Sequence, residues 1–398
     1  MNSAEMIANT MCTQSFLSFW SFANPIRKDN SKELTDILVV CDPYVIILSV
    51  KEIAVSPSGK KEVDSKRWYK RAITKSYKQL YGAERVISQK VSQILTADKR
   101  HEILFPSPDK MKLFRIGISL GRRQDFALPY GHFETGFVHF FDQFSFPILL
   151  NELDTITDLA DYLKAKEIFF DSGKSVLFRS EEDLLAIYLH RGHRFPEQLD
   201  SLYVAPFVWD EFSKKSEVIK RKEQENKSYI WDRIIEEFFL HFSKGELLFS
   251  STFSETEEAL RAIARESRFS RMMLADSFLD FIGFYATPKA RARLAPSPSG
   301  TTYVFLLDDH RENNRDQRLQ ELRLRCLAAR NVIENSPEVV GIATNPYVQG
   351  EGHSYDLCYL FLPALDSDKK QSLTRMQQEL GYFTKPNTSS KHYDEYPK

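Results

Sequence analysis

Two apolar segments separated by an Asp-Pro dipeptide constrain the fold of this chain more than any other feature. Residues 37–41 read ILVVC and residues 44–50 read YVIILSV, so each has the composition of a buried strand. The dipeptide between them leaves room for a tight turn, which predicts an antiparallel hairpin. Charged residues stand at the outer ends of the pair, because Asp36 precedes the first segment and Lys51 ends the second.

The register of this hairpin predicts a contact between the two charged residues. Side chains alternate faces along a strand, so Asp36 shares a face with Leu38, and Lys51 shares a face with Ile47. The beginning of one strand lies beside the end of the other, which brings Asp36 and Lys51 together at one end of the sheet. A charge inside apolar strands costs free energy unless it is paired, hydrogen-bonded or metal-bound. The pair is therefore either a simple ion pair on a hairpin or part of a functional site.

The order acid, strand, turn, strand, x-Lys resembles the PD-(D/E)XK nuclease superfamily. Its restriction-endonuclease-like core consists of a helix, a three-stranded meander, a crossover helix and a further strand. Asp36 matches the first acid of the motif, and residues 49–51 (SVK) stand where the (D/E)XK triplet belongs. Residues 33–36 (ELTD) and 75–83 (KSYKQLYGA) are also similar to segments of uncharacterised nuclease-like bacterial proteins. The resemblance covers roughly the first quarter of the chain.

The resemblance implies hydrolysis of phosphodiester bonds with Mg²⁺ or Mn²⁺. It assigns catalytic roles to four residues: Asp36, Lys51, Ser49 and Glu33. It assigns the cation to the Asp36 carboxylate, to the strand carbonyl near Val50 and to Glu5 on an expected N-terminal helix. Ser49 departs from the triplet, whose first residue is an acid. A hydroxyl is a weaker ligand for a hard cation than a carboxylate. Either Glu5 or Glu33 must then complete the site, or the chain is a catalytically inactive nuclease-fold scaffold or interaction protein.

A long helix is predicted over residues 65–89, which contain no proline. Four of its cations recur at spacings of four, four and three and therefore line one face: Arg67, Arg71, Lys75 and Lys78. In the nuclease interpretation this crossover helix presents them, together with Gln79, to the phosphates of a nucleic acid, and DNA is expected in preference to RNA. The interleaved Trp68, Tyr69, Tyr77 and Tyr81 would stack on bases. The alternative is a solvated charged helix whose aromatic side chains belong to the core.

The expected fold class is α/β (α+β), with three regions along the chain. Residues 1–195 would form the nuclease-like domain, a mixed sheet flanked by helices, with a β extension. Residues 196–290 read as a helical region, and residues 291–398 as a C-terminal α/β layer with strands at 302–307, 339–343 and 355–361. The helical or C-terminal region is the expected site for a protein partner.

Charge and cysteine content restrict the class of protein. The net charge is −1, so any affinity for nucleic acid must come from local patches. The four cysteines are far apart, which predicts reduced, mostly buried thiols and no zinc site. No apolar run reaches the length of a membrane span, and the first twenty residues read as an amphipathic helix. We expect a cytoplasmic protein without membrane contact, associated by analogy with bacterial antiviral defence or mobile elements.

Overall fold

The chain divides into two compact units, Met1–Ile219 and Lys220–Lys398. The computed structural model describes residues 2–53, 58–122, 126–134, 136–245, 253–283, 292–308, 315–346, 353–385 and 390–396. Both units combine a sheet with flanking helices, so the α+β fold class expected from the sequence is confirmed. No helix within these described ranges is long and apolar enough to cross a membrane.

A mixed sheet organises the first unit. In order across the sheet its strands are β1 (Ser21–Ala23), β3 (Ile37–Cys41), β4 (Tyr44–Glu52), β6 (Lys112–Leu120), β8 (Gly136–Asp142) and β7 (Gly131–Phe133). The first three form an antiparallel meander, whereas β4, β6 and β8 run parallel. The predicted hairpin is confirmed, since Cys41 pairs with Tyr44 across the two-residue turn.

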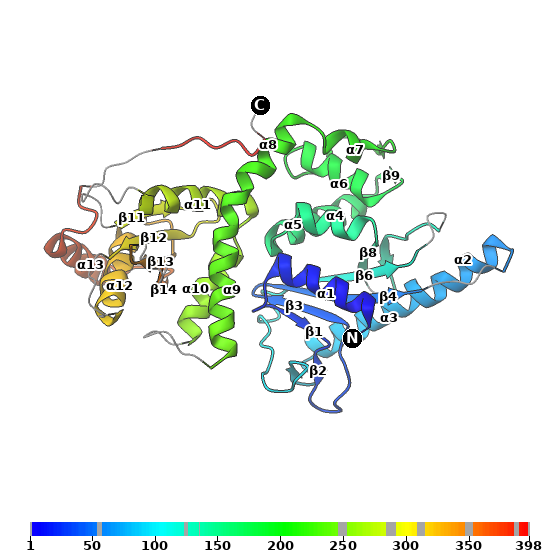
Figure 1. Cartoon of the computed structure of the whole chain (residues 1–398), viewed down its shortest axis with the longest axis horizontal. Helices are drawn as coiled ribbons and strands as arrows, with labels where there is room; N and C mark the ends of the chain where they lie inside the picture. The colour runs from blue at the N-terminus through cyan, green and yellow to red at the C-terminus, as the bar shows by residue number, and fades with distance from the viewer. Residues whose placement is uncertain are drawn as a thin grey trace. The chain divides into compact units, whose positions relative to one another are not determined.

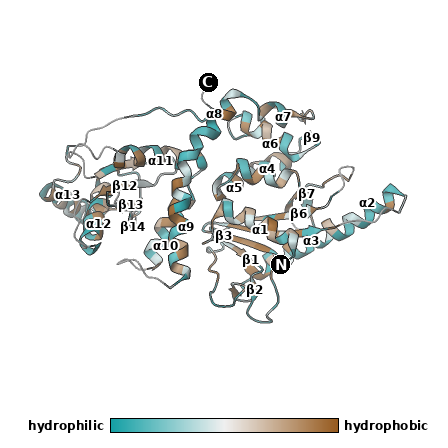
Figure 2. Cartoon of the chain, in the orientation of Figure 1, coloured by the Kyte–Doolittle hydropathy of each residue, from teal (hydrophilic) through white to brown (hydrophobic). Residues whose placement is uncertain are grey.

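One continuous helical segment connects β4 to β6. It comprises α2 (Lys61–Tyr69), a π-helical turn η1 (Lys70–Thr74) and α3 (Lys75–Ser88). The helix predicted over residues 65–89 is therefore confirmed, with an earlier start and one widened turn. We call the whole segment the crossover helix. Figure 1 shows α2 extending past the edge of the sheet, and Figure 2 shows that α2 is mainly hydrophilic.

The crossover helix packs on the sheet face that the alternation of β3 and β4 predicts. Leu38 of β3 and Ile47 of β4 share one hydrophobic cluster with Leu80 of α3, and all three are fully buried. On β6 of the same face, Gly117 lies in register with Phe140 of β8, whose ring fills the space that a side chain at Gly117 would need. The same side chains that make β3 and β4 apolar therefore fix which face the helix covers.

Helix α1 (Ser3–Phe16) covers part of the opposite face, beside α4 (Ser145–Glu152). Beyond the sheet the unit continues with further helices and short strands: α5 (Ile156–Asp171), α6 (Glu181–His190), α7 (Val208–Phe212), and the pairs β2 (Ile26–Arg27) with β5 (Ile94–Leu95) and β9 (Ser175–Leu177) with β10 (Ser201–Tyr203). His139 of β8 is fully buried.

The second unit contains a four-stranded sheet in its described residues. Its strands, in order, are β11 (Ala292–Pro296), β12 (Thr302–Leu307), β13 (Glu338–Thr344) and β14 (Tyr355–Phe361). Helix α12 (Arg315–Val332) packs on one face through Leu322 and Cys326, and α13 (Ser367–Leu380) lies against α12. The four cysteines of the chain are buried and form no disulfide with one another.

The expected helical region packs against this sheet. Its helices are α8 (Ser216–Glu225), η2 (Asn226–Ser228), α9 (Tyr229–Ser243), α10 (Phe253–Ala264) and α11 (Arg268–Gly283). Trp231 of α9 and Phe278 of α11 lie against Phe305 of β12, on the face opposite α12. The segment from residue 220 onward thus shares one compact unit with the C-terminal sheet, which sequence periodicity alone presented as separate regions.

Candidate functional site at the end of β4

Asp36 and Lys51 meet as the hairpin register predicts. The Lys51 ammonium donates to Oδ2 of Asp36 at 3.0 Å, and the main-chain N–H of Val50 donates to the same oxygen at 2.5 Å. Asp36 stands immediately before β3 and is 4% exposed, whereas the Lys51 side chain is 23% exposed. A buried carboxylate is therefore held at the end of the sheet with an ammonium group that reaches the surface.

The crossover helix adds a third partner to this carboxylate. Nε2 of Gln79 donates to Oδ1 of Asp36 at 3.0 Å, and the Ser49 hydroxyl lies 3.0 Å from Oε1 of Gln79. The same hydroxyl lies 3.2 Å from Oγ of Ser76, which is also buried. Gln79, expected to contact nucleic acid, is instead bonded to the candidate catalytic acid. Ser49 is brought to the site, but its hydroxyl is engaged by the helix.

A second acid lies close to Asp36. The pKa of Glu33 is raised, first by partial burial of its carboxyl group, then by the negative charge of Asp36 and a hydrogen bond with it, and further by the charge of Glu5. Glu5 itself closes the capping box of α1, accepting from the main chain of Asn2 at 3.0 Å. Glu33 and Asp36 thus form a crowded pair, with Glu5 contributing charge from the helix start.

The chemistry of these donors fits a divalent cation. The Asp36 carboxylate offers about four lone-pair positions, and Val50, Lys51 and Gln79 occupy three of them. The hydrogen bond with Glu33 engages the Asp36 carboxylate further, so a cation would have to displace one of these contacts. Carboxylate oxygens are hard donors of the kind that Mg²⁺ and Mn²⁺ prefer. A cation would also relieve the repulsion that raises the pKa of Glu33. Among the described residues, however, no three His, Cys, Asp or Glu side chains are grouped as a metal site.

Two further polar residues follow at the same edge. In the parallel register Lys51 of β4 is level with Ser119 of β6, and Ser119 is level with Asp142 of β8. The Ser119 hydroxyl is buried and has no hydrogen-bond partner among the described residues. Asp142 is buried and accepts from Nε of Arg122 at 2.8 Å. The Arg122 guanidinium is thus engaged by the Asp142 carboxylate.

Residues 113–120 (LFRIGISL) have the apolar pattern of a buried strand, and they lie in β6, beside β4 in the mixed sheet. Sequence reasoning did not single out Ser119 or Asp142. The available signal was positional, because each is the polar residue at the carboxyl end of a predicted strand. Strands that run parallel bring such ends to one edge of a sheet.

The predicted basic face of the crossover helix is exposed. Arg67, Arg71, Lys75 and Lys78 all point to solvent and have no ion pair with any residue of the described ranges. Trp68 follows the alternative of an aromatic side chain in the core, because it is 1% exposed and packs on Phe126. The helix therefore offers charge beside the candidate site, with its largest aromatic ring directed into the core.

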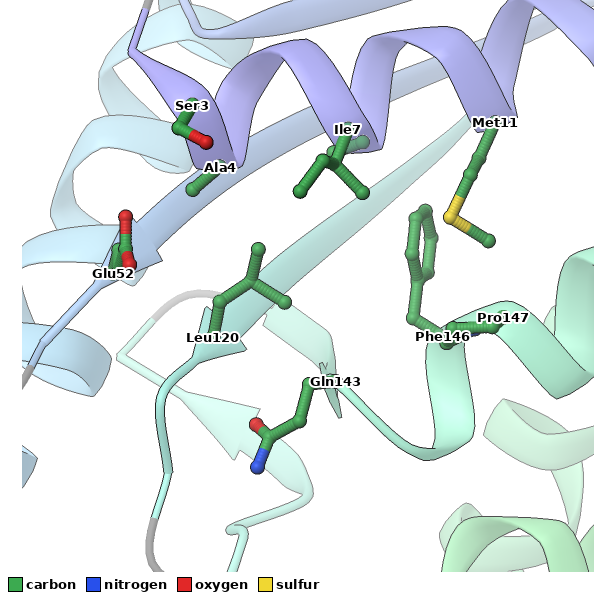
Figure 3. A pocket seen from close by; sticks show the side chains of 10 residues that line it. Ser3, Ala4, Ile7, Met11, Glu52, Leu120, Gln143, Phe146 and Pro147 are labelled. Carbon is green, nitrogen blue, oxygen red and sulfur yellow. The ribbon is translucent and has the colours of Figure 1, made fainter.

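A cavity of about 240 Å³ lies on the other face of the sheet. Figure 3 shows Met11 and Ile7 of α1 above Leu120 and Phe146, with Glu52 and Gln143 at its borders. Glu52 alternates with Lys51, and Leu120 alternates with Ser119, so this cavity is separated from the Asp36 site by the sheet. Glu52 therefore lies on the face of the sheet opposite Ser49 and Lys51.

Comparisons with protein-family models, with curated proteins and with solved structures give no match for this chain.

Proposed function

We propose that this chain is a divalent-metal-dependent nuclease that hydrolyses phosphodiester bonds of nucleic acid. One observation carries the proposal. A buried carboxylate, Asp36, stands where β3 begins, where β4 ends and where the crossover helix passes, with Lys51 bonded to it and Glu33 crowded beside it. An acid pair can hold a divalent cation, and a lysine that reaches the surface can donate to a phosphate oxygen, so this arrangement supports metal-assisted phosphodiester hydrolysis.

The order of elements supports the same proposal. The chain runs from α1 through the β1–β3–β4 meander and the crossover helix to β6, which pairs parallel to β4. This is the order of helix, meander, helix and strand in the core of the PD-(D/E)XK superfamily. A fold can host many functions, so the topology adds to the proposal without replacing the site.

The residues of the site have distinct roles in this proposal. Asp36 and Glu33 hold the cation, with the strand carbonyl at Val50 and Glu5 as further donors. The bound cation supplies a water of lowered pKa and neutralises charge on the phosphate. Lys51, fixed at one side by Asp36, directs its remaining N–H groups toward solvent, where they donate to a phosphate oxygen as its charge develops.

Gln79 of the crossover helix and Ser49 of β4 surround the Asp36 carboxylate. Gln79 orients the Asp36 carboxylate, and the Ser49 hydroxyl in turn orients Gln79. In the proposed reaction Ser49 is therefore a positioning residue, which explains how a hydroxyl can stand in the triplet position of a carboxylate. A cytoplasmic location and a role in bacterial defence or mobile elements extend the same analogy.

A catalytically inactive nuclease-fold scaffold is the second candidate. The engagement of Ser49 with Ser76 and Gln79 favours it, because no third carboxylate then stands at the triplet position. The two candidates make opposite predictions for cleavage.

The test is cleavage of DNA and RNA by the purified full chain with Mg²⁺ or Mn²⁺. We expect activity that EDTA abolishes and that Asp36→Asn and Lys51→Met each reduce at least a hundredfold. Glu52→Gln is the matched control, since Glu52 is an exposed acid of the same strand on the opposite face. Absence of cleavage on every nucleic acid would support the scaffold, and cleavage that survives both site substitutions would reject the assigned site.

A further inference from the structure

The crossover helix carries a dense row of positive charge that the rest of the chain does not neutralise. Residues 65–83 contain no acid and six cations: Lys66, Arg67, Lys70, Arg71, Lys75 and Lys78. All six are exposed, and none makes an ion pair with a residue in the described parts of the chain. The net charge of the whole chain is −1, so this row is a local feature and not a reflection of bulk composition.

The aromatic residues interleaved with these cations are mostly withdrawn from the surface. Trp68 is buried against Phe126, with ring centroids 5.6 Å apart. Tyr77 stacks on Phe133 at 5.4 Å, and the Tyr81 hydroxyl donates to the main-chain oxygen of Gly136 at 2.8 Å. Of the four aromatic side chains in the row, Tyr69 alone is exposed.

A cationic surface without stacking rings discriminates between forms of nucleic acid. Proteins that bind single strands add aromatic stacking, worth about 1–3 kcal/mol per base, to their electrostatic attraction. A duplex presents paired bases that cannot stack on the protein, but it carries one phosphate charge per roughly 1.7 Å of axis. The row on the crossover helix exposes one ring, Tyr69, against six cations, so it has few of the groups that favour single strands and many that respond to phosphate density.

The dimensions of the row fit the backbone of a duplex. Arg67 and Lys78 are eleven residues apart, which corresponds to roughly 16 Å at the rise of a helix. This exceeds the width of the major groove, about 12 Å, so the row can contact phosphates on both of its sides. Figure 1 shows that the α2 part of the row extends past the edge of the sheet.

The row also ends at the candidate site. Lys78 immediately precedes Gln79, whose amide is bonded to Asp36. The row contains the π-helical turn η1, a feature that is frequent at functional sites. We infer that this face of the crossover helix binds double-stranded nucleic acid through its phosphates, without reading base sequence, and so delivers a duplex to Asp36. The inference names double-stranded nucleic acid as the substrate class of the proposed nuclease. The delivery of a duplex to Asp36 rests on that proposed function.

Binding can be measured apart from cleavage. The full chain in EDTA is titrated, by fluorescence anisotropy, against a duplex DNA, each of its single strands, and a second duplex of unrelated sequence. We expect the duplexes to bind equally within about twofold, and at least tenfold more tightly than the single strands. If about four phosphates are neutralised, raising the salt from 50 to 200 mM weakens binding roughly a hundredfold.

A charge-reversed pair tests the surface itself. The Arg71→Glu/Lys75→Glu variant should lose at least thirtyfold in duplex affinity, with unchanged circular dichroism because both side chains are exposed. Lys110→Glu is the matched control, since Lys110 is an exposed lysine before β6, at the end of the sheet opposite Lys51, and it should bind normally.

Three results would overturn the inference: equal or tighter binding of single strands, duplex binding unaffected by the double variant, or tighter binding to vesicles of anionic phospholipid than to duplex. These outcomes are separable from failure of the nuclease proposal. Duplex binding without cleavage in Mg²⁺ or Mn²⁺ supports the binding surface and rejects the nuclease. Cleavage confined to single strands supports the nuclease and rejects a duplex substrate.

Discussion

The two partners of the central ion pair should contribute unequally to stability. Asp36 accepts from three donors, one of them the main-chain N–H of Val50, a residue that is 2% exposed. Asp36→Ala leaves that N–H buried without a partner and releases Lys51 and Gln79. Lys51→Ala removes one donor from a carboxylate that keeps two others. The Asp36 carboxylate therefore stabilises the fold in addition to its role in the proposed reaction, whereas Lys51 contributes little to the stability of the fold.

The magnitudes follow from burial and hydrogen bonding. A buried donor left unpaired costs about 1–3 kcal/mol, and a hydrogen bond to a charged acceptor contributes about 1.5–3 kcal/mol. We expect Asp36→Ala to lower the free energy of unfolding by about 3 kcal/mol. Because the Lys51 side chain is partly exposed to water, Lys51→Ala should cost about 1 kcal/mol. The double variant should cost about as much as Asp36→Ala alone, which gives a coupling of about 1 kcal/mol.

Urea unfolding followed by tryptophan fluorescence measures these values in the full chain. Trp20, Trp68 and Trp209 belong to the first unit and Trp231 to the second, so the two transitions must be fitted separately. The change should be confined to the first unit. If Lys51→Ala destabilises that unit as much as Asp36→Ala does, the lysine is a structural counter-ion, and the role proposed for it in catalysis loses its basis.

Three further substitutions test other features of the two units. Gly117→Ala should destabilise the first unit by about 1–3 kcal/mol in urea unfolding, because the new methyl group overlaps the ring of Phe140; a neutral effect would contradict the packing described. Ser119→Ala removes a buried hydroxyl without a described partner and should leave stability unchanged or slightly raised, so a large loss of cleavage activity in this stable variant would show that the hydroxyl contacts the substrate. Burial raises the pKa of Glu266, so the folded second unit keeps a proton that the unfolded chain has lost, and its stability should fall as pH rises above about 4.5 through the raised pKa. Glu266→Gln should flatten this dependence in pH-resolved thermal melts, and an unchanged slope would refute it.

The parts of the site that depend on neighbouring residues could be predicted from the sequence. The hairpin, the pairing of Asp36 with Lys51 and the opposite direction of Glu52 all follow from a two-residue turn and strict alternation. The limits of the crossover helix and of the strands of the C-terminal sheet could also be predicted to within a few residues, because each follows from a local pattern of apolar and polar residues.

The remaining features depend on packing between segments that are distant in the chain. The rotation of the crossover helix on the sheet determines that Gln79 reaches Asp36 and that Trp68 is buried, and periodicity alone leaves this rotation open. Likewise, Ser119 and Asp142 come level with Lys51 because β6 pairs in parallel with β4 and β8 pairs in parallel with β6, a register that no local pattern encodes.

The dependence of Asp36 on Gln79 has a consequence during synthesis. The two residues are separated by 43 positions, so the acid leaves the ribosome well before the helix that orients it. At about 5–20 residues per second, this interval lasts roughly 2–9 seconds. The β3–β4 hairpin is complete in sequence once Glu52 has been made, but the crossover helix and the parallel partner β6 are still to follow. A nascent chain that already carries Asp36 and Lys51 therefore lacks the contact that orients the Asp36 carboxylate until the crossover helix has been made.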